Sequence, residues 1–286
     1  MDFIKELNSA VSLADEYIKS VLPKEKLPQE EIVKAMDYSL SSGGKRIRPV
    51  IAIFAAKSLG AGSESVMPYA AAIELIHTYS LIHDDLPCMD NDDLRRGRPT
   101  NHKVFGEATA VLAGDALLNF AFETALMADT EPEKKIALLK IIARSAGLYG
   151  MIGGQILDME GEKRKLAADE IRLMQNLKTG ALIKAAAAIG AVAAGERKEF
   201  FDVYAENLGL AFQLKDDILD VTATTEELGK PVLSDEKNEK STFVSLYGVD
   251  GAKRLLEETT EKAIASLPEG AELLKELALY LLEREK

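Results

Sequence analysis

Cysteine is almost absent from this chain: Cys88 is the only one among 286 residues. A disulfide within the chain is therefore excluded, and so is a zinc site that needs several cysteine ligands. Such low cysteine usage is typical of proteins in reducing compartments, and we expect a cytoplasmic protein.

Long apolar runs are also missing. The most apolar window, ALIKAAAAIGAVAAG at residues 181–195, contains a lysine and is shorter than the roughly 20 apolar residues that cross a bilayer. The N-terminal segment lacks the basic start and the unbroken apolar stretch of a signal peptide. We therefore expect neither a membrane span nor a signal peptide.

Positive charge is in deficit. The chain has 35 Lys and Arg residues against 47 Asp and Glu residues, which gives a net charge of −12. A polyanion such as a nucleic acid would be repelled by this balance, so we expect no nucleic-acid partner. The basic residues must therefore act locally.

Apolar residues at helical spacing are abundant. Hydrophobic residues make up 47% of the chain, and within residues 134–161 they form a stripe three and four apart: Ile136, Leu139, Ile142, Ala143 and Ala146. We find no convincing alternating run flanked by hairpin turns. The sequence predicts an all-α protein of ten or more helices, in a single domain that spans residues 1–286.

Acidic residues gather at two places, each at the end of an apolar helical segment. The first, IHDDLPCMDNDDLRRGRP at residues 82–99, contains five aspartates within ten residues: Asp84, Asp85, Asp90, Asp92 and Asp93. On a straight helix, Asp90 would point about 120° away from Asp84. Because Pro87 removes a helical hydrogen bond and crowds the preceding turn, we expect a distorted helix at residues 86–89 that returns Asp90 toward Asp84.

The second acidic group is KDDILD at residues 215–220. Asp216 and Asp220 are four residues apart and share a helix face, with Asp217 beside them. Such carboxylates repel each other unless a cation lies between them, and Mg²⁺ prefers oxygen ligands that phosphate oxygens complete. Taken alone, this group is equally typical of an exposed acidic helix face, and the first group of a salt-bridged surface loop.

Basic residues accompany these acids. Arg95 and Arg96 come directly after the first acidic group, and their planar guanidinium groups suit phosphate oxygens. In SSGGKRIRP, residues 41–49, three cations follow two glycines that allow the backbone to approach an anion closely: Lys45, Arg46 and Arg48. These patterns together predict a diphosphate held between arginines and magnesium, although the glycine motif alone is compatible with an ordinary basic loop.

Other polar side chains interrupt apolar helical segments. His77 lies two turns before Asp84 on the same face, where it is either structural or a donor to a phosphate. Lys178 and Thr179 lie within an apolar helix, and a buried lysine needs an anionic or carbonyl partner. Gln213 offers a neutral amide oxygen one turn before the second acidic group.

The longest irregular segment covers residues 221–242 and contains Gly-Lys-Pro. Its length and charge predict a mobile flap. We expect Lys230 and Lys240 in this flap to close on a bound diphosphate. Lys237 lies near enough in sequence to take the place of Lys240.

The order and spacing of these motifs resemble those of the short-chain trans-isoprenyl diphosphate synthases over essentially the whole chain. The motifs are GGKRIRP, LIHDDLPCMDNDDLRRGRPTNHKVFGE, AVLAGDALL, GGQILDM, KTGALI and FQLKDDILD. The resemblance implies an isoprenoid synthase fold, in which helices surround a central cavity, and a homodimer. It also implies a Mg²⁺-dependent prenyltransferase with three ions in each active site.

The same resemblance implies a role for each residue that matches a motif. The metal ligands are expected to be Asp84, Asp90 and Asp216, with Asp85, Asp217 and Asp220 either as further metal ligands or as supports behind them. The allylic diphosphate is expected to bind Arg95, Lys178, Lys230 and Lys240, and isopentenyl diphosphate is expected to bind Lys45, Arg48, His77 and Arg96. The allylic carbocation is expected to be stabilised by the carbonyl of Lys178, the hydroxyl of Thr179 and the amide oxygen of Gln213, with Arg95, Asp84 and Asp216 completing the catalytic set.

The implied reaction condenses isopentenyl diphosphate with dimethylallyl and geranyl diphosphate by ionisation, condensation and proton elimination. Tyr79 lies five residues before Asp84, about 7.5 Å back along the helix, with Ser80 beside it. A bulky ring at this place is expected to block the hydrocarbon pocket, which favours (2E,6E)-farnesyl diphosphate as product. The alternative is geranylgeranyl diphosphate, because the first acidic segment also resembles that of plastid geranylgeranyl diphosphate synthases.

Interpretations from other classes stay open at this point. A terpene cyclase shares the ionising chemistry but needs no second diphosphate pocket, which GGKRIRP and Arg96 supply here. A non-catalytic regulatory subunit would keep the fold and lose one acidic group, whereas both groups are present. A helical metal-binding protein would bind a divalent ion without diphosphate.

Overall fold

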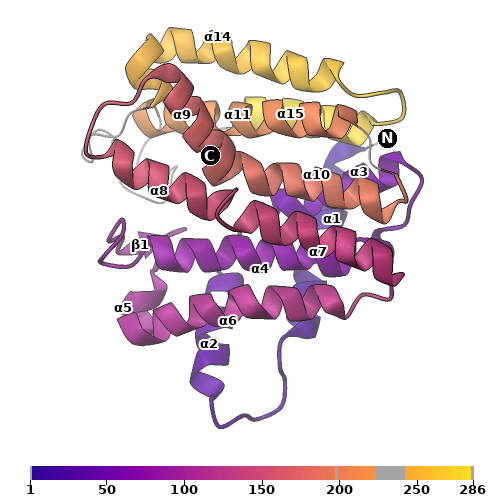
Figure 1. Cartoon of the computed structure of the whole chain (residues 1–286), viewed down its shortest axis with the longest axis vertical. Coiled ribbons are helices and arrows are strands. Elements are labelled where there is room, and N and C mark those ends of the chain that lie inside the picture. Colours follow the sequence, from indigo (N-terminus) through magenta and orange to yellow (C-terminus); the bar gives the residue numbers. More distant parts are fainter. Residues whose placement is uncertain (1, 197–198, 223–241, 285–286) are drawn as a thin grey trace.

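Helices make up most of the described part of the chain, which confirms the predicted all-α class. The computed structural model describes residues 2–196, 199–222 and 242–284, and Figure 1 shows their arrangement. The N-terminal half contains α1 (Phe3–Val21), α2 (Glu30–Leu40), α3 (Ile47–Ser58), the 3₁₀ turn η1 (Ser63–Ser65), α4 (Met67–Asp84), α5 (Asn101–Phe105) and α6 (Glu107–Leu126).

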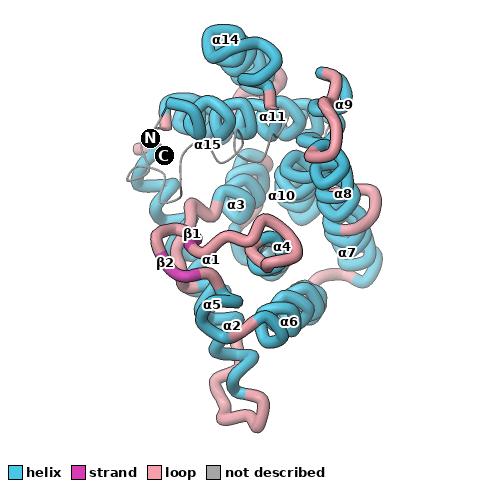
Figure 2. Tube along the Cα trace, turned by 90° about the vertical axis from the view of Figure 1, so that its left-hand side faces the viewer, coloured by secondary structure: helices cyan, strands magenta, loops and turns pink. Residues whose placement is uncertain are grey.

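The C-terminal half continues the same pattern with an irregular helical turn in its middle. Its elements are α7 (Pro132–Ala146), α8 (Met151–Gly161), α9 (Ala168–Gln175), the π-helical turn η2 (Asn176–Gly180), α10 (Ala181–Ala193), α11 (Glu199–Thr222), α14 (Phe243–Ala265) and α15 (Glu272–Glu283). Most of these helices run roughly alongside one another, so Figure 2 views several of them nearly end-on.

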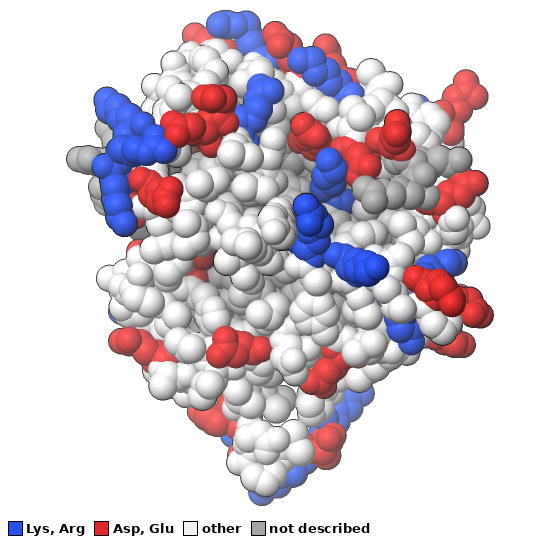
Figure 3. Space-filling model, in the orientation of Figure 1, with Lys and Arg blue, Asp and Glu red and all other residues white. Residues whose placement is uncertain are grey.

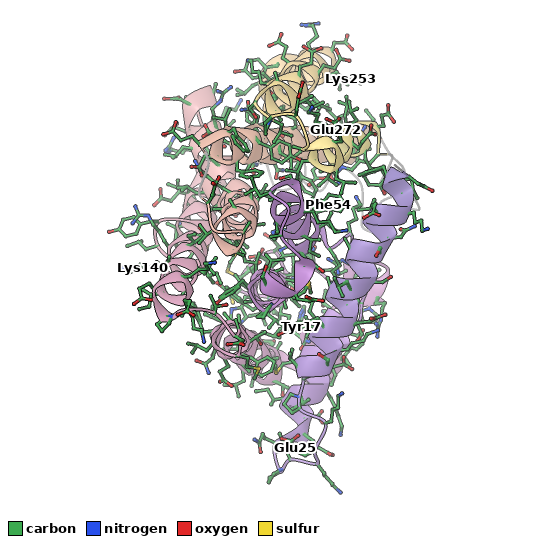
Figure 4. All side chains as sticks on the ribbon, turned by 90° about the vertical axis from the view of Figure 1, so that its right-hand side faces the viewer. Tyr17, Glu25, Phe54, Lys140, Lys253 and Glu272 are labelled. Atoms are coloured by element: carbon green, nitrogen blue, oxygen red, sulfur yellow. The ribbon has the colours of Figure 1, made fainter. Side chains whose placement is uncertain are left out.

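The helices α3, α4 and α10 form the centre of the molecule, with other helices around them (Figure 2). Gly190 on α10 lies directly against α3, where an added Cβ would overlap the carbonyl oxygen of Ala52. This glycine therefore allows the two helix backbones to approach closely. Phe54 on α3 is fully buried, and Figure 4 shows it inside the molecule, with Lys140 and Lys253 toward the outside.

The helix α4 leads to the first acidic group and contains its first aspartate, Asp84. It begins with Pro68 in its first turn, where proline is favourable because no helical N–H is lost. Apolar and small residues occupy nearly all of its faces, and most are buried. The helix ends at Asp84, three residues before Pro87. The chain therefore leaves the core at the acidic group.

One small hairpin was not predicted. β1 (Leu94–Arg95) and β2 (Arg98–Pro99) form an antiparallel pair. The two residues between them, Arg96 and Gly97, have φ angles of 53° and 73°, as a tight two-residue hairpin turn requires. Each strand is too short for alternation to show in the sequence, so only the glycine indicated a turn.

Two helical segments on one face leave much apolar surface uncovered. Glu107–Leu126 and Pro132–Gly161 are long and apolar enough to cross a membrane by length and composition alone. Within the chain, only 39% and 28% of their most apolar windows are buried. This is weak evidence for a span, because core helices of soluble proteins pass the same test. Figure 3 shows a largely uncharged area on the face where α6, α7 and α8 lie.

Candidate active site

The first acidic group lies on a tight turn at the end of α4. The backbone N–H of Asp90 donates to the carbonyl oxygen of Asp84 over 2.9 Å, and Asn91 N–H donates to Leu86 O over 3.1 Å. The expected return of Asp90 toward Asp84 is therefore confirmed. The expected distortion of the helix at residues 86–89 takes a different form, since the helix ends at Asp84 and a turn follows.

Asp84 bears a carboxylate whose charge is poorly compensated. Burial raises the pKa of Asp84 to about 6, and the negative charges of Asp90 and Asp85 act in the same direction. Lys178 and Arg95 oppose this shift but do not cancel it. A partly buried carboxylate in this situation favours either a proton or a metal cation.

Asp85 is already paired. Its buried carboxylate accepts from Arg95 through Nε at 2.7 Å and through a terminal nitrogen at 2.6 Å. Burial raises the pKa of Asp85, and Arg95 opposes that shift. In this arrangement Asp85 holds Arg95 beside the first acidic group.

The short hairpin separates the two neighbouring arginines. Arg95, in β1, reaches Asp85 on one side. Arg96, in the turn, donates to the carbonyl oxygen of Gly43 in the SSGGKRIRP loop. Gly44 leaves room for this contact, because an added Cβ would lie 2.7 Å from a terminal nitrogen of Arg96. One arginine therefore belongs to the acidic group and the other to the basic loop.

The basic loop does not present its three cations equally. Arg48 lines a cavity, and Lys45 is half-buried. Arg46 is 4% exposed and donates to Asp15 and Glu74. The expectation that all three cations form one phosphate pocket is therefore corrected for Arg46, whose guanidinium group is used inside the protein.

His77 lines the same cavity as Arg48 and Asp84. Burial lowers the pKa of His77 well below its ordinary value, and the surrounding arginines Arg48, Arg96, Arg95 and Arg46 lower it further. The imidazole is therefore neutral near pH 7, and it can still donate one N–H to an anion.

The KTG motif forms the π-helical turn η2. Lys178 Nζ lies 2.6 Å from Oδ2 of Asp158, a buried residue on α8. Gly154 on α8 lies against the backbone of Lys178, and an added Cβ would overlap its nitrogen. A π-helical turn departs from the α-helical hydrogen-bond ladder and is frequent at functional sites. This turn and the close contact of α8 together position Lys178 and Thr179.

Thr179 connects the cavity to α11. Its hydroxyl donates to Oε1 of Gln213 over 3.2 Å, and Gln213 donates to Asp217 over 3.0 Å. The other oxygen of Asp217 accepts from the backbone N–H of Phe243 over 2.9 Å. Asp217 and Asp220 are both buried. Asp217 thus orients Gln213 and attaches the start of α14 to α11.

Asp216 carries a partner that the sequence did not indicate. Arg284, which follows α15, donates to the Asp216 carboxylate and also to the carbonyl oxygen of Phe212 over 3.1 Å. Asp216 acts electrostatically on Arg48, which lines the cavity with Asp84. Arg48 therefore lies in the field of the second acidic group.

Among the described residues, no three His, Cys, Asp or Glu side chains lie close enough together to hold one metal ion. The donor chemistry nevertheless fits a hard divalent cation, because the available groups are carboxylates. Asp84 in particular combines burial with the adjacent acidic residues Asp85 and Asp90. The acidic groups fit magnesium as partial sites that other ligands complete.

The cavity has a volume of about 540 Å³ and lies between α4, α6, α8 and η2. Its polar lining includes the site residues Arg48, His77, Asp84, Lys178 and Thr179. The rest of its wall is mainly apolar and includes Tyr79, Leu118, Met151, Ile152, Ile156 and Met159, with Ser80 beside them. A cavity lined by both charged and apolar side chains suits an ionic head group on a hydrocarbon tail.

Some predicted residues cannot be placed. Lys230, Lys237 and Lys240 lie outside the described residues, as does most of the expected flap at residues 221–242. Their roles stay predictions.

Three site residues were missed by reasoning from the sequence. Asp158 lies in the quoted GGQILDM motif, and its acid within an apolar helix was an available signal. Glu74 is a similar acid inside the apolar part of α4. Arg284 gave no local signal, because its partner lies 68 residues away in sequence.

Comparison with known proteins adds independent information. The family model for polyprenyl synthetase matches residues 29–279. Farnesyl diphosphate synthase from Micrococcus luteus is 46% identical over 278 residues, which cover 94% of each chain. Geranylgeranyl pyrophosphate synthase 9, chloroplastic, from Arabidopsis thaliana is 44% identical over 87% of this chain and 73% of its own length.

A solved structure supports the same relationship. The geranyltransferase from Helicobacter pylori, complexed with magnesium and isoprenyl diphosphate, superposes with a TM-score of 0.85 at 33% identity. The match covers 99% of this chain and 97% of that chain. The likeness therefore extends over the whole fold.

Proposed function

The chain belongs to the polyprenyl synthetase family and is a trans-prenyltransferase, and we propose that it makes (2E,6E)-farnesyl diphosphate. The substrates are isopentenyl diphosphate and, in turn, dimethylallyl and geranyl diphosphate. The observation that supports this proposal best is a single cavity whose lining combines charged side chains with an apolar wall that includes Tyr79.

The allylic diphosphate binds beside the first acidic group, where Arg95 and Lys178 supply positive charge. Both cations are held by carboxylates in the structure, Arg95 by Asp85 and Lys178 by Asp158. Such pairing holds each cation in place until the diphosphate, a more highly charged anion, binds it in place of or together with the carboxylate. Lys230 and Lys240 are proposed to add to this site.

Isopentenyl diphosphate binds at the basic side, between Lys45, Arg48, His77 and Arg96. Arg48 and His77 both line the cavity. His77 donates from its neutral imidazole, because the arginines around it disfavour its protonation. This arrangement separates the two diphosphates, since the hairpin sends Arg95 and Arg96 to different sides.

Magnesium is the proposed cofactor, held by Asp84, Asp90 and Asp216 with three ions in each site. The uncompensated carboxylate of Asp84 supports this assignment. When bound, the metal neutralises charge on the diphosphate that leaves. Asp217 and Asp220 are proposed to support the site from behind, because both are buried.

Oxygen atoms on η2 stabilise the allylic cation that ionisation produces. The Thr179 hydroxyl donates a hydrogen bond to Gln213, so its lone pairs stay available to the cavity that Thr179 lines. The carbonyl of Lys178 lies within the π-helical turn. Neutral oxygens can stabilise a cation electrostatically without forming a bond to it. The isopentenyl double bond then attacks, and the released diphosphate takes the proton that is eliminated.

Product analysis tests this function. Purified protein with Mg²⁺, labelled isopentenyl diphosphate and either dimethylallyl or geranyl diphosphate should give farnesyl diphosphate from both starters. A geranylgeranyl product would keep the reaction class and overturn the product assignment. No condensation with either starter would overturn the enzymatic proposal and favour a metal-binding or regulatory protein.

We further propose that the protein is a homodimer in the cytoplasm. Apolar side chains that a second copy would cover lie exposed on α6, α7, α8 and the connection before α8, namely Val111, Leu112, Ile136, Leu148, Tyr149, Ile152 and Ile156. Contiguous apolar surface of this kind is typical of an interaction site. Cys88, exposed and unpaired, supports a reducing compartment. Sedimentation of the wild type and Leu112→Asp tests the dimer, since the variant should shift toward monomer.

A further inference from the structure

Arg46 is the least exposed cation of the basic loop and has the most internal partners. Its Nε donates to Asp15 on α1 over 2.7 Å, and a terminal nitrogen donates to Glu74 on α4 over 3.0 Å. The other terminal nitrogen donates to the carbonyl oxygen of Leu40, at the end of α2, over 2.5 Å. One side chain therefore joins three helices behind the basic loop.

Glu74 is the carboxylate at the centre of this arrangement. It is 2% exposed, and only its Oε1 is engaged by Arg46. Its Oε2 is buried and has no hydrogen-bond partner in the described part of the chain. An incompletely satisfied buried carboxylate is costly, and its retention in an apolar helix calls for a function.

The field of Glu74 reaches the cations that face the cavity. Burial lowers the pKa of Arg48, and the Glu74 carboxylate opposes that shift. The same carboxylate opposes the lowering of the Arg96 pKa. Three arginines from two loops thus lie in the field of one buried acid, which reduces their mutual repulsion while no anion is bound.

The backbone at Arg46 explains why its side chain controls the loop. Arg46 has φ of 48° and ψ of 35°, a left-handed conformation that is unfavourable for a residue with a Cβ. It lies between Lys45 and Arg48 and immediately before α3. The guanidinium group of Arg46 is anchored on Asp15 and Glu74, immediately before the helix that carries Arg48.

We propose that Asp15 and Glu74, acting through Arg46, are positioning residues for the isopentenyl diphosphate pocket. They touch no substrate. They hold the basic loop in its binding conformation and provide the negative charge that lets Arg48 and Arg96 gather before the diphosphate arrives. The proposal rests on the proposed function, because it assigns residues to one of its two substrate pockets.

The support from Asp15 comes from outside the matched family model. That model begins at residue 29, whereas α1 ends at Val21. The helix packs against α3 and α4, and Figure 4 shows it along one side of the molecule. The N-terminal helix thus contributes to a substrate pocket although none of its residues lines the cavity.

Glu74→Gln is the main test, because it keeps the shape of the side chain and removes its charge. We expect the KM for isopentenyl diphosphate to rise about tenfold or more, with kcat and the KM for geranyl diphosphate within about twofold of wild type. Asp15→Asn, at a half-exposed position, should shift the same KM in the same direction by a smaller factor. Arg46→Lys should recover part of the effect of Arg46→Gln.

The matched control is Tyr204→Phe, which removes a buried hydrogen bond to Leu274 O far along the chain. It should lower thermal stability and leave both KM values unchanged. The positioning role is wrong if Glu74→Gln raises the KM values for both substrates equally. It is also wrong if Glu74→Gln leaves both KM values unchanged, as Tyr204→Phe should. Should Glu74→Gln fail to fold, an unchanged isopentenyl KM in Asp15→Asn and Arg46→Lys is the result that rejects it.

Direct binding separates this inference from the proposed function. Calorimetry with isopentenyl diphosphate is done on wild type, Glu74→Gln and Asp15→Asn, without an allylic substrate. If wild type binds the ligand and makes no prenyl product, the proposed function fails, and weaker binding by the variants still supports the positioning role. If wild type does not bind, or the variants bind equally well, the positioning role fails.

Discussion

Arg284, close to the C-terminal end, forms an ion pair with Asp216 of the second acidic group. Its guanidinium group also lies over the ring of Phe212, with 4.1 Å between Cζ and the ring centroid. The Arg284 side chain is 5% exposed and the Asp216 side chain 41% exposed. The end of the chain therefore supplies a cation to a carboxylate that we assign to magnesium.

Removing this cation should weaken the metal-free protein. We expect Arg284→Gln to lower the free energy of unfolding by about 1–2 kcal/mol, less than for a fully buried pair because Asp216 is partly hydrated. Magnesium with pyrophosphate should narrow this gap, because it provides another positive partner for Asp216. Denaturant unfolding with chelator and with the added ions measures both effects.

The control for this prediction is Arg164→Gln, which breaks an exposed pair with Glu170. That variant should match wild type in both conditions, because exposed ion pairs contribute little to stability. An Arg284→Gln protein whose stability deficit is the same with and without magnesium pyrophosphate would contradict a shared role for Asp216.

The acidic and basic motifs could be predicted from the sequence because each is local. Asp84 and Asp90 lie on one turn, and Pro87 between them indicated that Asp90 returns toward Asp84, as the structure shows. Partners that meet only through tertiary packing left no comparable signal. Neither the pairing of Asp216 with Arg284 nor the inward direction of Arg46 follows from spacing, because each depends on where distant helices pack.

His77 should stay neutral at a pH where an ordinary histidine is largely protonated. Burial and the surrounding arginines hold the pKa of His77 well below 6.5. The unfolded chain then binds a proton near pH 6.5 that the folded chain does not. The stability that this histidine contributes is therefore present above about pH 6.5 and is lost as the pH falls toward the folded pKa.

An NMR titration of the ring carbons tests this prediction. The signal that disappears in His77→Gln identifies the residue, and it should keep the shift of a neutral imidazole at about pH 5.5. A signal that moves to the protonated position near pH 6.5 would show that burial and the arginines do not lower the pKa of His77.

Asp84 should behave in the opposite way toward pH. Its pKa of about 6 in the folded state exceeds the ordinary 3.8, so the folded protein binds more protons between these values. Stability should therefore fall as the pH rises from about 4 to 6 and stay lower above that range. Without metal at about pH 7.5, Asp84→Asn should be more stable than wild type by on the order of 2 kcal/mol.

Denaturant unfolding in the presence of a chelator measures this gain, and prenyl transfer should be lost in the same variant. The gain should shrink as the pH approaches 4. The control is Asp93→Asn, because Asp93 is exposed and Lys103 lowers its pKa. An Asp93→Asn protein should gain no stability at about pH 7.5. Equal stability of wild type and Asp84→Asn at that pH would show that the charge of Asp84 is compensated in the folded protein.

Tyr79 should determine the length of the product. The residue is 5% exposed and lines the apolar part of the cavity, and its ring packs edge-on against His83 at 5.7 Å between centroids. Tyr79→Ala removes a ring and hydroxyl that are larger than an isoprene unit, and a cavity of that size is not refilled completely by relaxation. We expect products longer than farnesyl diphosphate, identified by chromatography after incubation with labelled isopentenyl diphosphate.

Tyr79→Phe separates the ring from its hydroxyl. The Tyr79 hydroxyl oxygen is buried and has no hydrogen-bond partner within the residues described. Removal of the hydroxyl should therefore change the stability of the protein little. The product should stay at farnesyl diphosphate because the ring still limits the length of the cavity. If Tyr79→Ala also stops at farnesyl diphosphate, another part of the wall ends chain growth, and Leu118 and Ile156 become the residues to enlarge or reduce next.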